Sequence, residues 1–585
     1  MSLYLTPLNP HLKEIRILHL QPLTSGPSIR CSTSTVSLLS QPSPSYEALS
    51  YVWGDASIQQ EIQFDGAPFP VTRNLFTALQ HLRLPDQERR LWVDALCINQ
   101  KDIKERNEQV AMMGEIYVYA RPVLIFLGEA DEGSNEAFNL ISRVSEEGEI
   151  EDNVSRKLFS FYMNLVEREW FTRLWTVQEL VLASQDPMVG CGFSWISWSV
   201  LLRVWQRVAL REFGEMEMVI SSEESDEGNE SEELSGRRPN GIKIDLLSNL
   251  RKAVTEKKGE ELRDLLLNTV SCKATEPRDR IYGLLGMLVE GHRNDITVDY
   301  SRPLGQVYAE AITHIFRRGI GPFLLSGMEL AGPTPSDSSF PSWVPMFGSR
   351  TLPSPTKFHP PGVGASGAGS GADNGRVDED IQTLRVRGMP IDTVLEKIEF
   401  GEGLACLTQL SAVEALVSKA RQLATENKHH RLYLNSFKSK EPVWRTLIAN
   451  KAYSGAAREV APESYGEMYQ RLRDNPDIGW NSDENPARKY ILALMNHLPG
   501  SCFFISTTGF YGISQGTLEV GDHLAIWFGA PAPFALRPKA QVQDESGELK
   551  YAVCGVAYVA GIMDGEMVDE IYCEDLEDDM LFIVH

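Results

Sequence analysis

Glu179 is the residue whose surroundings in this sequence most favour chemistry. It lies four positions after Trp175 in the stretch E-R-E-W-F-T-R-L-W-T-V-Q-E-L-V-L-A (167–183), which has the apolar spacing of one amphipathic helix. A carboxylate beside an indole on an apolar face is poorly solvated, so we expect a raised pKa, and such acids concentrate at working sites. The alternative is an ordinary helix in which Glu179 pairs with Arg173 or another cation.

Polar or turn-forming residues follow three predicted strands: Gly54-Asp55, Asn99-Gln100 and Gly128-Glu129. The carboxyl ends of parallel strands meet at one edge of a sheet, where ligands bind. We therefore expect these residues to face one crevice. Asn99 and Gln100 fit a simple turn equally well.

Asp94 interrupts the apolar run R-L-W-V-D-A-L-C-I (90–98), which is typical of a central parallel strand. An acid in such a run is costly unless it is paired. Asp94 either pairs with an arginine or a backbone amide, or it orients a ligand hydroxyl. Cys97 is expected to pack rather than to act as a nucleophile. We expect Trp53, Trp92 and Trp175 in the core, with stacking on a base or nicotinamide ring as the alternative.

The elements that would position these residues alternate between strand and helix. Strands are predicted at 14–20, 29–39, 46–53, 90–98, 121–128 and 188–192, with a hairpin at 60–72 around Asp65-Gly66 and helices at 74–82, 105–120, 134–144, 154–165 and 167–183. Thr72 or Asn74 is the expected cap of the helix at 74–82. Alternation of this kind predicts an α/β fold with a parallel sheet and helices on both sides.

The rest of the chain divides by composition. We predict a β-strand lead-in over 1–45, the α/β domain over 46–200, an acidic disordered loop over 201–240, a helical region over 241–350, a Pro/Gly/Ser-rich linker over 351–378 and a C-terminal α+β domain over 379–585. The C-terminal domain becomes β-rich from Cys502 onward, which suggests a small half-barrel.

Composition excludes several classes of protein. The net charge of −24 argues against broad nucleic-acid binding, which needs a basic surface. No apolar run approaches the roughly 20 residues of a membrane helix, and the first residues do not resemble a signal peptide, so we expect a cytoplasmic protein. Eight scattered cysteines contain no CxxC pair. Neither a disulfide scaffold nor a zinc site is indicated.

Cofactor motifs are not supported either. Gly362 to Gly367 match GxGxxG but follow two prolines instead of a strand, and no phosphate-binding GxxxxGK[ST] or metal-binding HExxH occurs. We therefore predict no metal and no resident cofactor.

Three blocks of the sequence resemble the signature blocks of the fungal heterokaryon incompatibility (HET) domain. They are Y-E-A-L-S-Y-V-W-G-D (46–55), L-W-V-D-A-L-C-I-N-Q-K-D (91–102) with E-x-x-x-Q-V (105–110), and W-F-T-R-L-W-T-V-Q-E-L (170–180). D-R-I-Y-G-L-L-G (279–286), S-W-V-P (342–345), G-D (521–522) and Y-V-A-G-I-M-D-G-E (558–566) resemble further landmarks of long family members. The usual acid and aromatic after S-W-V-P are replaced here by Met346 and Phe347.

The HET domain is in turn similar to TIR domains, which have a flavodoxin-like fold. TIR enzymes that cleave NAD carry a W-C-x-x-E-L motif with a catalytic glutamate. Residues 175–180 match that motif except that Thr176 replaces the cysteine. The resemblance therefore implies a catalytic Glu179, with Gly54, Asp55, Asp94, Asn99, Gln100 and Trp175 binding a small nucleotide such as NAD as substrate.

The resemblance implies a fungal incompatibility protein that triggers growth arrest or cell death on association with itself or with another incompatibility-type protein. NAD glycohydrolysis would be its chemistry, since one carboxylate can stabilise the oxocarbenium-like state of that reaction. The rival hypothesis is a non-enzymatic TIR-like adaptor that acts through assembly. A third is a divergent HET protein in another fungal process.

Overall fold

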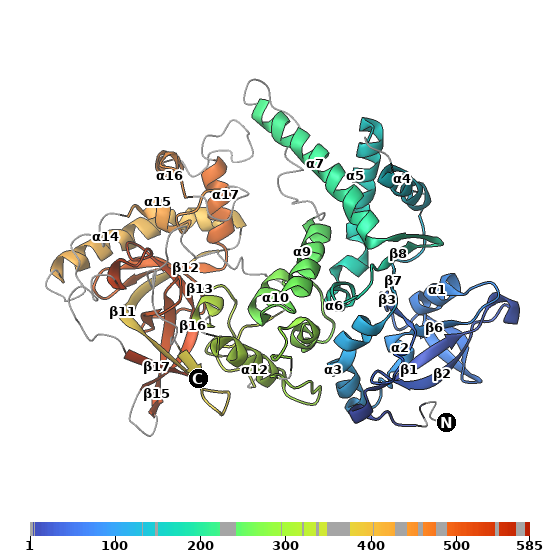
Figure 1. Cartoon of the computed structure of the whole chain (residues 1–585). Helices are drawn as coiled ribbons and strands as arrows, with labels where there is room; N and C mark the ends of the chain where they lie inside the picture. Colours follow the sequence, from blue (N-terminus) through green and yellow to red (C-terminus); the bar gives the residue numbers. More distant parts are fainter. Residues whose placement is uncertain are drawn as a thin grey trace. The chain divides into compact units, whose positions relative to one another are not determined.

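The computed structural model describes residues 4 and 6–585 except 132, 147–149, 223–241, 294, 319–320, 335–338, 348–374, 402, 428–440, 454–459, 475–487, 544–548 and 569–579. The chain forms two compact units, Met1–Ser301 (unit 1) and Arg302–His585 (unit 2) (Figure 1). Predicted features that fall on the omitted residues, namely 223–240 of the acidic loop and most of the 351–378 linker, lie outside the described residues.

Unit 1 is built on a nine-stranded sheet in the order β5-β4-β2-β1-β6-β3-β7-β8-β9. Its strands are β1 (Glu14–Leu20), β2 (Arg30–Ser37), β3 (Glu47–Tyr51), β4 (Gln59–Phe64), β5 (Ala67–Thr72), β6 (Arg89–Trp92), β7 (Val123–Phe126), β8 (Met188–Cys191) and β9 (Ser194–Ser197). Strands β6, β3, β7 and β8 pair in parallel, whereas β1 pairs antiparallel with both β2 and β6. The sheet is thus mixed, which corrects the prediction of a parallel sheet.

The helices of unit 1 lie before, between and after these strands in the sequence. They are η1 (Pro10–Leu12), η2 (Leu23–Ser25), α1 (Arg73–Leu82), α2 (Asp94–Cys97), α3 (Ile103–Tyr119), α4 (Ser134–Glu146), α5 (Asp152–Glu167), η3 (Glu169–Thr172), α6 (Trp175–Val181), α7 (Trp198–Ser222), α9 (Ile242–Lys257), α10 (Leu262–Asn268), α11 (Asp279–Tyr282) and η4 (Leu285–Met287). Helix α7 covers 201–222, the first part of the range predicted as an acidic loop.

Several local predictions are confirmed. The hairpin turns at Asp65-Gly66, where both residues have positive φ. Thr72 caps α1 by accepting a hydrogen bond from the Leu75 amide. The predicted helix at 105–120 is α3, which starts two residues earlier.

Two of the boundaries that matter most for the site were wrong. The run 90–98 is strand only to Trp92, and Asp94 begins the short helix α2. The run 167–183 is the end of α5, then η3, then α6, instead of one helix. Both runs are largely buried, and a continuous apolar run does not distinguish a strand from a buried helical turn.

Unit 2 contains a sheet whose pairings close into a ring. Its strands are β10 (Gly375–Val377), β11 (Leu384–Glu399), β12 (Ser501–Ser506), β13 (Tyr511–Gly516), β14 (His523–Trp527), β15 (Phe534–Gln543), β16 (Leu549–Val559) and β17 (Met580–Val584). The order β11-β12-β13-β16-β15-β14 returns to β11, because the long β11 pairs with β14 in its middle and with β12 toward its end. The ring encloses a core that includes Phe504, Leu524 and Ile526.

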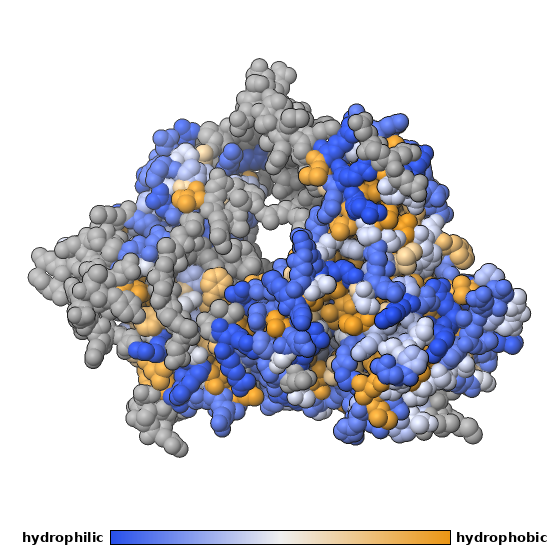
Figure 2. All heavy atoms as spheres, in the orientation of Figure 1, coloured by the Kyte–Doolittle hydropathy of each residue, from blue (hydrophilic) through white to orange (hydrophobic). Residues whose placement is uncertain are grey.

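The helices of unit 2 are α12 (Leu304–Phe316), α13 (Gly321–Leu325), η5 (Gly403–Gln409), α14 (Leu410–Glu426), α15 (Val443–Thr446), α16 (Ser464–Asp474) and α17 (Arg488–His497). Among the residues that the structure describes, no helix has the length and apolar character needed to cross a membrane. Figure 2 shows hydrophobic residues in scattered groups among hydrophilic ones on the face that it presents.

Candidate functional site

The candidate site lies where the parallel strands of unit 1 end. Strand β3 pairs with β6 on one side and with β7 on the other, both in parallel, so their carboxyl ends share one edge of the sheet. Helix α6 packs on β3 and β7. This arrangement brings the third sequence block, with Glu179, against the first, 46–55.

Glu179 is buried, with 5% of its surface exposed, and its carboxyl is fixed to strand β3. The Ser50 hydroxyl donates a short hydrogen bond to Glu179 Oε2 and accepts one from Trp170 Nε1 at 2.8 Å. Burial raises the pKa of Glu179 to about 8, and the nearby Asp94 charge adds to the shift. Glu179 is therefore mostly protonated at neutral pH in this structure.

Asp94 is the second acid of the site. Its Oδ2 accepts from the Trp53 indole at 2.7 Å, and its Oδ1 accepts from the Ala95 amide at 2.7 Å. Desolvation raises the pKa of Asp94 to about 6, against the opposing effects of these hydrogen bonds and of the Arg173 charge. The sequence left open whether Asp94 pairs with an arginine or a backbone amide, or orients a ligand hydroxyl. The observed partners are an indole and a backbone amide, and no arginine hydrogen-bonds to Asp94 in the described residues.

Two tyrosines adjoin both acids. The charges of Glu179 and Asp94 reinforce burial in raising the pKa of Tyr51 and Tyr117 well above the usual value. Tyr117 donates to the Leu49 carbonyl at 3.3 Å. The buried Tyr51 hydroxyl has no hydrogen-bond partner among the described residues. A buried unpartnered hydroxyl is costly, and it marks a place where a ligand atom or a water could bind.

The other predicted site residues are only partly brought together. Gln100 donates to the Asp94 carbonyl at 3.1 Å, and Asn99 accepts from the Lys101 amide in the turn after α2. Gly54 has a positive φ. Asp55 is exposed and accepts from Ser57 instead of from another site residue.

Trp175 is directed to a different set of partners. Its indole donates to Asp279 Oδ2 at 2.8 Å, and Tyr300 donates to Asp279 Oδ1 at 2.6 Å. The Arg106 guanidinium lies 3.6 Å from the centre of the Tyr300 ring. Trp175 thus links α6 to residues 279–300 and, through them, to α3.

Two residues that follow α6 in the sequence, Arg251 and Gly286, hydrogen-bond to it. The Arg251 guanidinium donates to the carbonyls of Leu180, Val181 and Gln185, at and just beyond the end of the helix, where carbonyls lack helical partners. The Gly286 amide donates to Gln178 Oε1 at 3.1 Å. The helix that carries Glu179 is therefore positioned by residues well beyond it in the sequence.

Sequence reasoning missed several neighbours of the two acids: Ser50, Tyr51, Tyr117 and, through its bond to Ser50, Trp170. It named Arg173 beside Glu179 but not that the Arg173 charge also acts on Asp94. A signal for one of them was present. Ser50 is a hydroxyl within the otherwise apolar strand A-L-S-Y, and a buried serine needs a partner. Nothing in the spacing points to Tyr117.

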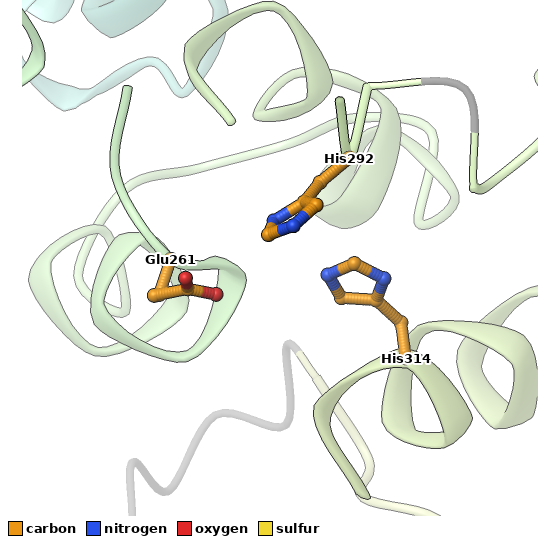
Figure 3. A group of neighbouring side chains, drawn as sticks. All are labelled: Glu261, His292 and His314. Atoms are coloured by element: carbon orange, nitrogen blue, oxygen red, sulfur yellow. The ribbon is translucent and has the colours of Figure 1, made fainter. Parts of the chain in front are cut away.

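A glutamate and two histidines, residue types that can ligate a metal, lie outside this site. Glu261 precedes α10 and His292 follows η4 in unit 1, whereas His314 lies near the end of α12 in unit 2 (Figure 3). The absence of a metal site stays a prediction from the sequence.

Comparison with known proteins decides the family. Residues 46–179 match the model of the heterokaryon incompatibility protein (HET) family. The chain is a HET-domain protein. The match ends at Glu179 and covers the first two sequence blocks and nearly all of the third, which confirms the resemblance drawn from them.

The second half of this HET-domain protein also has a family match. Residues 409–577 match the Het-6 beta-barrel domain, in agreement with the closed ring of strands in unit 2. A similar protein is "Heterokaryon incompatibility protein 6, OR allele" of Neurospora crassa, 26% identical, with the alignment covering 96% of this chain and 95% of the relative. No solved structure matches, so the TIR-like classification of the fold stays a prediction.

Proposed function

We propose that this protein acts in fungal heterokaryon incompatibility, and that unit 1 triggers growth arrest or cell death on self-association by hydrolysing NAD with Glu179. The incompatibility role is supported by the HET-domain match and by the similarity to heterokaryon incompatibility protein 6 of Neurospora crassa. The chemical step is supported by the constellation around Glu179 and by the resemblance of residues 175–180 to the TIR motif.

The chemical proposal depends mainly on two acids with raised pKa values that lie near a buried hydroxyl, which has no hydrogen-bond partner among the described residues. Glu179, Asp94 and Tyr51 come from separate elements, α6, α2 and β3, yet both carboxylate charges raise the pKa of Tyr51, and the Asp94 charge raises that of Glu179. Perturbed acids beside the carboxyl ends of parallel strands are typical of ligand sites.

Besides NAD and water, the reaction needs a carboxylate near the ribose and a group that holds the substrate. The bond between ribose C1′ and the nicotinamide nitrogen breaks, the electron pair stays on nicotinamide, and water bonds to C1′ with loss of a proton. The cationic ring of bound NAD would lower the pKa of Glu179, because an opposite charge favours the ionised carboxyl. The carboxylate would then stabilise the positive charge that moves onto the ribose. Asp94 would hold a ribose hydroxyl.

The test uses the full-length chain at high protein concentration with NAD, and measures released nicotinamide. We expect release by the wild type and none by Glu179→Gln. Glu169→Gln is the matched control, because Glu169 is an exposed acid just before α6, and this variant should behave like the wild type. Equal release by wild type and Glu179→Gln would remove the catalytic role.

The same hydrogen bonds also favour a second candidate function. The Ser50–Glu179 bond fastens α6 to β3, as a purely structural carboxyl would do in an assembly adaptor. Expression of both variants in a fungal host separates the two. Under the adaptor hypothesis growth arrest occurs while NAD levels stay constant, and Glu179→Gln is as toxic as the wild type.

A further inference from the structure

Three polar side chains form a hydrogen-bonded line across the N-terminal part of the unit 1 sheet. His19 in β1 lies 2.6 Å through Nδ1 from Glu88 Oε1, and 2.7 Å through Nε2 from the Ser34 hydroxyl in β2. Glu88 immediately precedes β6, which pairs with the other side of β1. A hydroxyl, an imidazole and a carboxylate joined in this order have the geometry of an activated serine nucleophile.

Strand register places the three side chains on one face. His19 is opposite Ser32 in β2 and opposite Arg90 in β6. Ser34 and Glu88 are each two residues from those positions, and side chains two residues apart in a strand share a face. The imidazole therefore spans the diagonal between its two neighbouring strands.

The carboxylate end of the line is held in place and ionised. Glu88 Oε2 also accepts from Gln21 Nε2 at 2.7 Å, and the hydrogen bond from His19 lowers the pKa of Glu88. An ionised carboxylate only accepts hydrogen bonds, so Nδ1 must carry a proton. In the neutral imidazole, Nε2 is then left to accept the proton of the Ser34 hydroxyl.

A cation lies beside this line. Arg90, directly opposite His19, has a buried Nε with no hydrogen-bond partner among the described residues. Buried guanidinium nitrogens are normally paired, so an open one can donate to an anionic group. Its positive charge would favour the negative charge that develops on a carbonyl oxygen under attack.

We propose that Ser34, His19 and Glu88 form a second catalytic site, distinct from Glu179, that hydrolyses carboxylic esters. Ser34 Oγ attacks the ester carbonyl carbon while His19 Nε2 takes the hydroxyl proton. The bond to the alcohol oxygen then breaks, His19 returns the proton to the departing alcohol, and an acyl-serine remains. Water, deprotonated by His19, releases the acid and restores Ser34. Glu88 positions the imidazole throughout.

This site is independent of the proposed NAD chemistry. Ser34 and His19 precede the HET match at 46–179, and their hydrogen bonds connect them to each other and to Glu88 rather than to the Glu179 site. A structural network that only ties three strands together would show the same distances but no enhanced reactivity of Ser34, and the experiment tests that difference.

The first measurement is covalent labelling of the full-length protein with a fluorophosphonate, followed by peptide mass spectrometry. Ser34 Oγ bonds to phosphorus and fluoride leaves. We expect Ser34 to be modified in the native protein but not after heat denaturation. His19→Gln should slow labelling roughly 100-fold, the usual contribution of a general base. Ser32→Ala is the matched control, which removes an exposed serine on the same face, and should label at the wild-type rate.

A second measurement keeps the proposal testable if His19→Gln fails to fold. Ser34→Cys and Ser32→Cys place a thiol at two positions of β2 on the same face, and the first replaces the hydroxyl that contacts His19 Nε2. Alkylation by iodoacetamide at neutral pH should be at least several-fold faster for Ser34→Cys. Equal alkylation rates, or fluorophosphonate on other serines in preference to Ser34, would overturn the proposal. The wild type should also hydrolyse p-nitrophenyl acetate, and both Ser34→Ala and Glu88→Gln should lose this activity.

Discussion

Gly286 of η4 and Gly114 of α3 are in direct backbone contact. A Cβ on Gly286 would lie 3.0 Å from the Gly114 Cα and 2.6 Å from Gln178 Oε1. The absence of a side chain at both positions is what lets η4 reach α6 and donate to Gln178. The glycine at the end of D-R-I-Y-G-L-L-G thus has a packing role at the helix that carries Glu179.

Gly286→Ala should therefore destabilise unit 1. The added methyl group must displace the buried Gln178 amide or push the backbones of η4 and α3 apart, and overpacking of this kind costs about 1–3 kcal/mol. Chemical denaturation of the full-length protein gives the measurement. Gly133→Ala is the control, because the nearest atom to its Cβ would be 3.8 Å away. Equal stability of the two variants would mean that α3 and η4 separate easily.

The pH dependence of stability should report on Glu179. Its pKa rises from 4.5 to about 8 in the folded protein, so between these values the native state holds a proton that the unfolded state has lost. The stability that this group contributes is complete below pH 4.5 and falls as pH rises toward 8. Glu179→Gln removes the effect, and the free energy of unfolding of the wild type should decline relative to the variant between about pH 5 and pH 8. Parallel profiles would show that Glu179 is ionised in the native state.

Arg251→Met should loosen α6. The guanidinium pairs with two carbonyls at the end of the helix and one just beyond it, and its loss leaves these acceptors unpaired at a cost of about 1–3 kcal/mol. Lys252→Met is the matched control, because the Lys252 side chain is 72% exposed. Hydrogen exchange at the amides of 178–182 is the direct measurement. It should speed up in Arg251→Met and stay unchanged in Lys252→Met.

Glu105→Gln should be among the more damaging single changes. Glu105 and Arg16 form a buried pair at 2.5 Å, and Glu105 also accepts from the Asn99 amide in the turn that follows α2. Removal of one partner leaves a buried charge uncompensated, at about 3–5 kcal/mol. The exposed Glu136–Lys157 pair provides the comparison, since Glu136→Gln should change stability by less than about 1 kcal/mol. The midpoint of thermal unfolding distinguishes the two.

Elements whose signals are local could be predicted from the sequence. The Asp65-Gly66 hairpin, the Thr72 cap and the helix around 105–119 depend on residues within a few positions of one another, and all three are present. Asp94 shows where this fails. Its run is apolar whether it is strand or helical turn, and only the tertiary structure, with Trp53 as the partner of the carboxyl, sets the boundary.

The two acids of the candidate site could be singled out from the sequence, but the side chains around them could not. Glu179 and Asp94 stand out because acids in apolar runs are rare. The Trp175–Asp279 bond joins residues separated by 104 positions, and the Ser50–Glu179 bond joins residues separated by 129. No periodicity within one element carries such information.

The two sheets differ in when their strands leave the ribosome. The last strand of unit 1, β9, ends at Ser197, so that sheet can form while the second half of the chain is still being synthesised. In unit 2, β17 pairs with β11, which is made long before it, and with β16. In newly made unit 2, the 384–388 edge of β11 therefore stays without β17 until residue 584 emerges, and an open strand edge can pair with other chains during that interval.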